Sequence, residues 1–201
     1  MNIKRTKFNV IILGETAVGK TTMIQKKLGN VVDNSTLATI GIDNFSEKQK
    51  FDGEDYIFKI YDTAGQEKYK SLTKSVIKLN EGFLLVFSVD DRNTFERVNN
   101  WIEDINQIVN LDEKIIFLVG NKIDKPKREV QYEEADKFAN ENGMKYFETS
   151  AMTGERIKEV FETLYKEDYE KNKNKSKVKG KESKVELKKN DHKKNKKKCC
   201  A

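Results

Sequence analysis

Residues 8–21 read FNVIILGETAVGKT, and they predict how the chain begins to fold. Phe8–Leu13 is a short apolar run that ends at Gly14, which is typical of a buried strand. Thr21–Leu28 has the length and apolar spacing of a short helix. A buried strand that passes through a glycine-containing turn into a helix indicates the first unit of an α/β sheet.

The turn between this strand and this helix matches the pattern G-x-x-x-x-G-K-[ST]. Its glycines let backbone N–H groups wrap around phosphates, and the N-terminus of the helix adds positive potential. The side chain of Lys20 would reach the β- and γ-phosphates, and the hydroxyl of Thr21 would bind Mg²⁺. The nucleotide-binding residues predicted here are Gly14, Glu15, Thr16, Ala17, Val18, Gly19, Lys20, Thr21 and Thr22.

Further apolar runs of strand length recur along the chain. Two of them flank Asp52-Gly53, a strong hairpin turn signal, so these two strands are predicted to be antiparallel neighbours. The strands predicted after the first one are Asn44–Phe51, Asp55–Tyr61, Phe83–Val89, Ile115–Val119 and Lys145–Phe147.

Apolar residues at helical spacing alternate with these strands. The helices predicted in this way cover 95–109, 132–142, which Gly143 closes, and 157–165, which opens near Thr153. Continuous apolar strands alternating with helices indicate an α/β fold with a mostly parallel sheet. With the phosphate-binding turn, we predict a P-loop NTPase fold: a six-stranded sheet with one antiparallel edge hairpin strand and helices on both faces.

Polar residues follow several of the predicted strands, and ligands of such sheets bind at these strand ends. Asp62 comes after the third strand, where its carboxylate suits Mg²⁺ binding or could simply cap a helix. Gly65, three residues later, allows the backbone to approach a terminal phosphate closely.

Two more post-strand segments suit a nucleotide base. Asn121-Lys122-Ile123-Asp124 carries a carboxylate that can accept two hydrogen bonds from guanine, whereas adenine lacks that paired donor set. Glu148-Thr149-Ser150-Ala151 is predicted to be a tight loop whose backbone could donate to a base carbonyl. Either segment alone would also fit an ordinary cap or turn.

In their order, these segments resemble the small GTPase family over about residues 7–170. By that resemblance the segment 121–124 binds guanine, Ser150 and Ala151 complete the base pocket, and Met152 stands where the family usually has a lysine. The residues that the resemblance assigns to the base are Asn121, Lys122, Asp124, Ser150, Ala151 and Met152.

The resemblance also implies hydrolysis of GTP to GDP with Mg²⁺. Gln66 matches the family's glutamine that orients the attacking water, and Thr39 matches the threonine that closes on Mg²⁺. Gly65 is expected to contact the γ-phosphate through its backbone. Phosphoryl transfer needs positioning and charge neutralisation more than covalent chemistry. The expected catalytic residues are Gln66, Lys20 and Thr39, and the expected metal ligands are Thr21, Thr39 and Asp62.

Within this family, three segments resemble the Rab branch: TIGID at 39–43, YKSLT at 69–73 and WIEDI at 101–105. The chain departs from the Rab pattern at Asn44, where Rabs have phenylalanine, and over 76–80. Residues 81–89 are more similar to the Ras branch. These departures bear on which effector and escort proteins the chain binds.

The charge of the chain is unevenly distributed. The whole chain carries 39 basic and 33 acidic residues, a net charge of +6. Residues 171–201 hold fourteen lysines against three acidic residues, a net charge of +11, which leaves −5 for residues 1–170. We therefore divide the chain into a GTPase domain, 1–170, and a lysine-rich tail, 171–201, which has too few apolar residues to fold. The tail could be solubilising or could bind an anionic surface, either membrane or nucleic acid.

Cys199 and Cys200 are adjacent, so they exclude a disulfide framework. No apolar run approaches the 18 residues of a membrane span, and no signal sequence is evident. Because a lysine-rich segment followed by Cys199-Cys200-Ala201 resembles a Rab tail, both cysteines are expected to be prenylated. From the residues alone, an unmodified pair of cysteines or weak metal binding is the alternative. Two lipids and clustered lysines would hold the protein on an anionic cytosolic leaflet.

The expected function is that of a monomeric, membrane-anchored switch in vesicle trafficking on the cytoplasmic face of intracellular membranes, with a cytosolic pool. Its expected partners are GTP and GDP, effectors, an exchange factor, a GTPase-activating protein and an escort or GDP-dissociation inhibitor, without specific nucleic acid. An alternative is a nucleotide-loaded switch that hydrolyses GTP slowly. Two departures motivate it: Thr16, and Val32 in place of the family's aromatic residue that packs on guanine. The sequence is also compatible with a Ras-like signalling GTPase and with a nucleic-acid-binding protein that has a basic tail.

Overall fold

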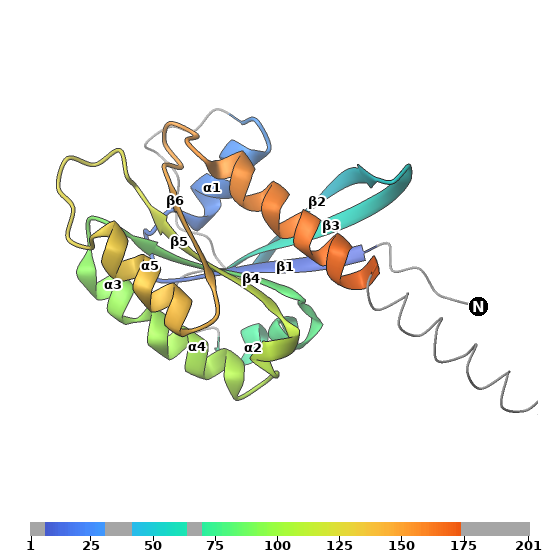
Figure 1. The fold of residues 1–201 in the computed structure, drawn as a ribbon, viewed down its shortest axis with the longest axis horizontal. Coiled ribbons are helices and arrows are strands. Elements are labelled where there is room, and N and C mark those ends of the chain that lie inside the picture. The colour runs from blue at the N-terminus through green and yellow to red at the C-terminus, as the bar shows by residue number, and fades with distance from the viewer. Residues whose placement is uncertain (1–6, 31–41, 64–69, 174–201) are drawn as a thin grey trace, which may run out of the picture.

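The computed structural model describes residues 7–30, 42–63 and 70–173. Its strands are β1 (Lys7–Leu13), β2 (Ile42–Phe51), β3 (Glu54–Thr63), β4 (Gly82–Ser88), β5 (Ile115–Asn121) and β6 (Lys145–Thr149). They form one sheet in the order β2-β3-β1-β4-β5-β6, with helices on both faces (Figure 1). The predicted α/β class and the six-stranded sheet are confirmed.

The predicted hairpin forms one edge of the sheet. β2 and β3 pair antiparallel over their whole length, whereas all other neighbouring strands pair parallel. Asp52 and Gly53 form the turn with φ angles of 47° and 82°. Two successive positive φ angles match the right-handed twist of the flanking strands, which explains why Asp-Gly is a strong hairpin signal.

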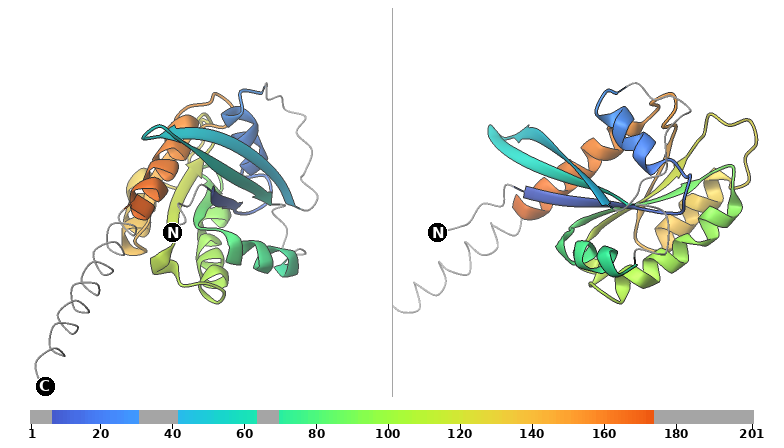
Figure 2. Two further views of the ribbon diagram at one scale, coloured as in Figure 1. Left: turned by 90° about the vertical axis from the view of Figure 1, so that its right-hand side faces the viewer. Right: turned by 180° about the vertical axis from the view of Figure 1, so that it is seen from behind.

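The helices are α1 (Lys20–Lys27), α2 (Lys70–Leu79), α3 (Arg92–Glu96), α4 (Val98–Asn106) and α5 (Tyr132–Glu141), with a 3₁₀ turn at Leu111–Glu113 and a C-terminal helix over 157–173. α1 and the C-terminal helix cover one face of the sheet, and α2 to α5 cover the other (Figure 2). Because successive side chains of a strand point to opposite faces, β1 supplies Val10 and Ile12 to the first core and Ile11 and Leu13 to the second.

The apolar stripe predicted as one helix over 95–109 is divided in the structure. α3 begins earlier because the Asp91 side chain caps it by accepting a hydrogen bond from the backbone N–H of Asn93. Arg97 separates α3 from α4, and α4 ends at Asn106. Ile108 and Val109 lie beyond that helix but still pack against the same core. Apolar spacing thus predicted burial correctly and helix limits only approximately.

Two further helices differ from the prediction. We did not predict α2, whose Val76 and Ile77 pack against the second core. The C-terminal helix begins at residue 157 rather than near Thr153, because Gly154 and Arg156 have φ angles of 92° and 55°, which are incompatible with a right-handed helix.

The C-terminal helix is described through residue 173, so residues 171–173 of the predicted tail are helical. The rest of that tail lies outside the described residues. Within residues 7–30, 42–63 and 70–173, no helix is both long and apolar enough to cross a membrane.

The strand order decides where the post-strand segments meet. β1 lies between β3 and β4, so the chain after β1 continues to one side of it and the chain after β3 to the other. In parallel sheets a ligand crevice forms outside the carboxyl ends of the strands at such a reversal. The turn after β1 and the ends of β3, β5 and β6 are therefore neighbours.

Candidate functional site

The turn after β1 is in close contact with the last residue of β5, Asn121. Gly19 has a φ angle of 100°, and a Cβ atom there would lie 2.4 Å from Nδ2 of Asn121. Only glycine tolerates both conditions. α1 begins directly after Gly19, so the unpaired N–H groups of its first turn border this turn. Such a helix start attracts an anion.

Lys20 supplies a positive charge inside the turn. Its side chain is buried, and Nζ donates hydrogen bonds to the carbonyl oxygens of Gly14 at 2.9 Å and Glu15 at 2.8 Å. Burial lowers the pKa of Lys20 to about 8, although the carboxylates of Asp62 and Glu15 act in the opposite direction. An anionic ligand in this turn would stabilise the charged ammonium group.

Thr21 and Asp62 bring two oxygen ligands together beside Lys20. Thr21 Oγ1 donates to Asp62 Oδ2 at 2.6 Å, and Asp62 is fully buried at the end of β3. A hydroxyl and a carboxylate are ligands that suit Mg²⁺. Among residues 7–30, 42–63 and 70–173, no group of three or more His, Cys, Asp or Glu side chains could hold a metal.

Asn121 joins three segments of the site. Its Nδ2 donates to the carbonyl oxygen of Val18 in the turn after β1 at 2.8 Å. Its Oδ1 accepts from Thr149 Oγ1 at 3.1 Å and from the backbone N–H of Ala151 at 2.9 Å. Asn121 is almost completely buried, so these contacts satisfy a polar group that would be costly without partners.

Asp124 and Ser150 also meet. Ser150 Oγ donates to Asp124 Oδ1 at 2.5 Å and accepts from the backbone N–H of Thr153 at 3.1 Å. Asp124 is exposed, so its carboxylate is accessible to a ligand. Lys122, with a φ angle of 70°, lies 3.9 Å from the carboxylate of Asp90. Met152, at 41% exposure, stands at the rim.

The remaining predicted residues are placed as follows. Thr16 and Ala17 are exposed in the turn after β1, and Thr22 is partly buried in α1. Thr39, Gly65, Gln66, Val32, Cys199 and Cys200 lie outside the described residues.

Two side-chain contacts of the site were not predicted. Glu148 and Thr149, which the sequence placed in a loop, are the last residues of β6, and Thr149 bonds Asn121 from the neighbouring strand, where the two residues are paired in register. Arg97 lies 3.2 Å from the carboxylate of Glu15 and so contacts the turn after β1 from the junction of α3 and α4. Nothing in the local sequence indicates the Arg97 contact, because 82 residues separate the two partners.

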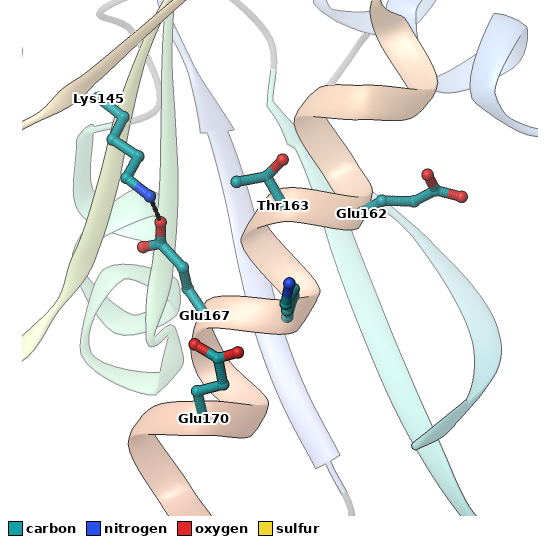
Figure 3. A pocket seen from close by; sticks show the side chains of 6 residues that line it. Lys145, Glu162, Thr163, Glu167 and Glu170 are labelled. Atoms are coloured by element: carbon teal, nitrogen blue, oxygen red, sulfur yellow. Dashed lines mark hydrogen bonds and ion pairs between the residues drawn. The ribbon is translucent and has the colours of Figure 1, made fainter. Parts of the chain in front are cut away.

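A separate pocket of about 340 Å³ lies between the start of β6 and the C-terminal helix (Figure 3). An ion pair between Lys145 and Glu167 spans it. None of the predicted site residues belongs to it. It is lined by Lys145, Glu162, Thr163, Lys166, Glu167 and Glu170.

Comparison with known proteins bears on this arrangement. The model of the family described as "Ras family" matches residues 9–170. The chain belongs to the Ras family of small GTPases. It is 36% identical over 159 residues to the Ras-related protein Rab-18-B of Danio rerio, and the aligned region covers 79% of this chain and 78% of that protein. It is 38% identical over 152 residues to the Ras-related protein Rab-4 of Dictyostelium discoideum, and the aligned region covers 75% of this chain and 74% of that protein.

The chain is also 35% identical over 158 residues to the Ras-related protein Rab-13 of Bos taurus, covering 78% of this chain and 77% of that protein. This small GTPase is therefore Rab-like, and as a Ras-family enzyme it hydrolyses GTP. Membership of the family implies a bound guanine nucleotide.

Proposed function

We propose that this GTPase is a Rab-type switch that is anchored to intracellular membranes and acts in vesicle trafficking. The observation that carries the nucleotide-binding part of the proposal is the hydrogen bonding of Asn121. Its side chain bonds both Val18, in the turn after β1, and Ala151, after β6. A site of this kind can bind the phosphates and the base of one nucleotide together. Its similarity to Rab proteins supports the choice of branch.

The phosphates would lie in the turn after β1. Its backbone N–H groups and the start of α1 surround the anion, and Lys20 neutralises the β- and γ-phosphates. To do so, its Nζ exchanges contacts with the carbonyl oxygens of Gly14 and Glu15 for phosphate oxygens. The proposed phosphate-binding residues are Gly14, Glu15, Thr16, Ala17, Val18, Gly19, Lys20, Thr21 and Thr22.

Guanine would be recognised by Asp124. Its carboxylate accepts hydrogen bonds from N1–H and from the exocyclic amino group, a donor pair that adenine does not present. The hydrogen bond from Ser150 orients this carboxylate. Asn121 and Lys122 support the base from the same loop, and the segment from Ser150 through Ala151 and Met152 completes the pocket.

Mg²⁺ would be held by Thr21, Thr39 and Asp62, and the 2.6 Å contact between Thr21 and Asp62 supports a role for both in binding one ion. When bound, the ion would supply positive charge that neutralises the negative charge developing on the phosphates.

Hydrolysis would depend on the placement of one water molecule. The side-chain amide of Gln66 orients that water for in-line attack on the γ-phosphorus. Lys20 stabilises the negative charge on the departing phosphate oxygens, and the backbone of Gly65 binds the γ-phosphate. Intrinsic turnover of such a site is slow, and an arginine from an activating protein accelerates it by about 10³–10⁵-fold.

Loss of the γ-phosphate would release the segments that carry Thr39 and Gly65, and effector binding would end. The partners of this cycle are effectors, an exchange factor, a GTPase-activating protein and an escort or GDP-dissociation inhibitor. The protein acts as a monomer in this scheme.

Anchoring would use the segment after the C-terminal helix. Prenyl groups on Cys199 and Cys200 insert into the bilayer, and the lysines of 174–198 each add about 1 kcal/mol near an anionic leaflet. The GTPase domain, 1–170, would then stand on the cytoplasmic face of a vesicle or endomembrane, attached by the 171–201 tail.

Nucleotide selectivity tests the proposed site. Purified full-length protein should bind fluorescent GDP and GTP with Mg²⁺ and release them slowly, while ATP and ADP should not compete. The matched variant Asp124→Asn should lose guanine selectivity. Its side-chain amide presents an N–H donor toward the N–H donors of guanine, where the Asp124 carboxylate presents an acceptor. Competition by ATP equal to that by GTP, or binding of neither nucleotide, would refute the proposal.

Localisation tests the anchor. Tagged wild type should mark discrete membranes, and a Cys199→Ser, Cys200→Ser double variant should become diffuse. Neutralising lysines after residue 173 should weaken the labelling without abolishing it. Persistent membrane labelling by the double cysteine variant would contradict lipid anchoring.

A further inference from the structure

The loop between β5 and α5 contacts the two residues that flank Thr149 in sequence, Glu148 in β6 and Ser150 just after it. At the start of the loop, Asp124 accepts its hydrogen bond from Ser150. Further along the loop, Arg128 contacts Glu148, the residue that precedes Thr149 in β6. Because β6 is paired with β5 along its whole length, it is a firm support, and contacts to this part of the chain limit where the loop can move.

The contact between Arg128 and Glu148 is bidentate. Nη1 of Arg128 donates to Oε1 of Glu148 at 2.6 Å, and Nη2 donates to Oε2 at 2.9 Å. Nη1 also donates to the carbonyl oxygen of Val130 at 3.2 Å. The two side chains are 27% and 13% exposed. Two parallel charge-assisted bonds in a partly buried place fix orientation as well as distance.

Tyr146 also holds the Glu148 carboxylate. Its hydroxyl donates to Oε1 of Glu148 at 2.9 Å, and its ring stacks on Phe87 with the ring centres 6.2 Å apart. Burial raises the pKa of Tyr146, so the hydroxyl remains a donor. Gly120 leaves the room for it, because a Cβ atom there would lie 2.6 Å from the Tyr146 oxygen.

We propose that Arg128 and Glu148 are positioning residues for guanine recognition, and that they act through the loop that carries Asp124. The proposal rests on the proposed function of Asp124 as the guanine acceptor. Neither residue touches the nucleotide in this scheme. Their paired contact holds the far part of the loop to β6, so that the near part presents the Asp124 carboxylate in one orientation before the base arrives.

A change in this positioning has a specific signature. Guanine offers N1–H and an exocyclic amino group to Asp124, whereas hypoxanthine offers only N1–H. A well-placed carboxylate therefore favours GDP over inosine diphosphate (IDP), and a displaced one loses the second hydrogen bond first. General destabilisation of the fold would weaken both nucleotides equally and leave their affinity ratio unchanged.

The test compares the affinities of full-length wild type and Glu148→Gln for GDP and IDP by competition with fluorescent GDP. We expect the IDP-to-GDP ratio of dissociation constants in Glu148→Gln to fall by about tenfold, since the altered loop costs the second bond to the base. Arg128→Lys, which keeps the charge but not the two parallel bonds, should give an intermediate ratio and remains informative if Glu148→Gln does not fold.

Glu47→Gln is the matched control. Glu47 likewise accepts from a basic side chain and from a buried tyrosine hydroxyl, Lys27 at 2.8 Å and Tyr165 at 3.2 Å, but these contacts join β2 to α1 and the C-terminal helix and involve neither β6 nor the loop between β5 and α5. Its ratio should equal that of wild type. If wild type prefers GDP to IDP and both Glu148→Gln and Arg128→Lys keep the wild-type ratio of dissociation constants, the positioning role is overturned. A wild type with no preference for GDP over IDP would instead overturn guanine recognition by Asp124, and the inference with it.

Discussion

The side-chain amide of Asn121 donates to the main-chain oxygen of Val18 at 2.8 Å, across 103 residues of sequence. The bond joins the end of β5 to the turn after β1. We propose that these two segments bind the base and the phosphates of one nucleotide, and we therefore expect that displacement of either one affects the other.

Replacement of Asn121 by alanine should therefore impair both stability and nucleotide retention. The change leaves the buried Val18 carbonyl and the Ala151 N–H without the Asn121 partner that each has now. We expect a loss of about 2–4 kcal/mol in the free energy of unfolding, measured by urea denaturation, and faster GDP release.

Asn142→Ala serves as the control for that variant. Asn142 is exposed, and its Nδ2 donates to the carbonyl oxygen of Phe138 within the same helix end. The control should change stability by less than about 0.5 kcal/mol. Equal effects of the two substitutions would mean that Asn121 does not connect the two segments energetically.

Thr21→Ala should remove the dependence of GDP release on Mg²⁺. In wild type, chelation with EDTA should accelerate release by at least about tenfold, which corresponds to about 1.4 kcal/mol in the activation free energy of release. Without its hydroxyl, the variant should release GDP quickly with or without EDTA. Thr163→Ala, on the C-terminal helix, should behave as wild type, and an unchanged EDTA response of Thr21→Ala would exclude the hydroxyl as a ligand.

Gln66→Leu should slow GTP hydrolysis without weakening GTP binding. The leucine side chain cannot hydrogen-bond to the attacking water, so we expect single-turnover phosphate release to fall on the order of 10- to 100-fold. Gln107→Leu, far along the chain at the end of α4, is the corresponding control. Equal rates for wild type and Gln66→Leu would remove Gln66 from its proposed role.

Truncation should locate the functional boundary of the domain. Tyr169 stacks on Phe51 with ring centres 4.9 Å apart, and Lys173 lies 2.7 Å from the carboxylate of Asp52. A chain of residues 1–173 keeps these contacts with the hairpin and should retain the stability and GTPase rate of the full protein.

A chain ending at residue 165 loses the Tyr169 contacts and the buried Asp168. Its free energy of unfolding should decrease by about 3 kcal/mol or more in urea denaturation. If 1–173 were inactive, the lysine-rich segment would be part of the catalytic domain rather than a separate tail.

Much of the fold could be predicted because its signals are local. Continuous apolar runs predicted the central strands of the parallel part of the sheet, since these strands are buried on both faces. Asp52-Gly53 predicted the hairpin because the turn requires two positive φ angles. Helix limits were less predictable, as α2 and the division at Arg97 show, because short helices depend on packing against the sheet more than on their own sequence.

The sequence by itself determined the chemistry of this GTPase: a glycine-rich turn with Lys20 and Thr21, and polar residues at the strand ends in the order of the family. These depend on residue type and on the few residues around them. Only the tertiary structure decided which side chains meet. The contacts of Asn121 with Val18, of Thr149 with Asn121 and of Arg128 with Glu148 exist because β1 lies between β3 and β4 and β5 beside β6. Strand order of this kind results from burial of the whole sheet, which no single segment encodes.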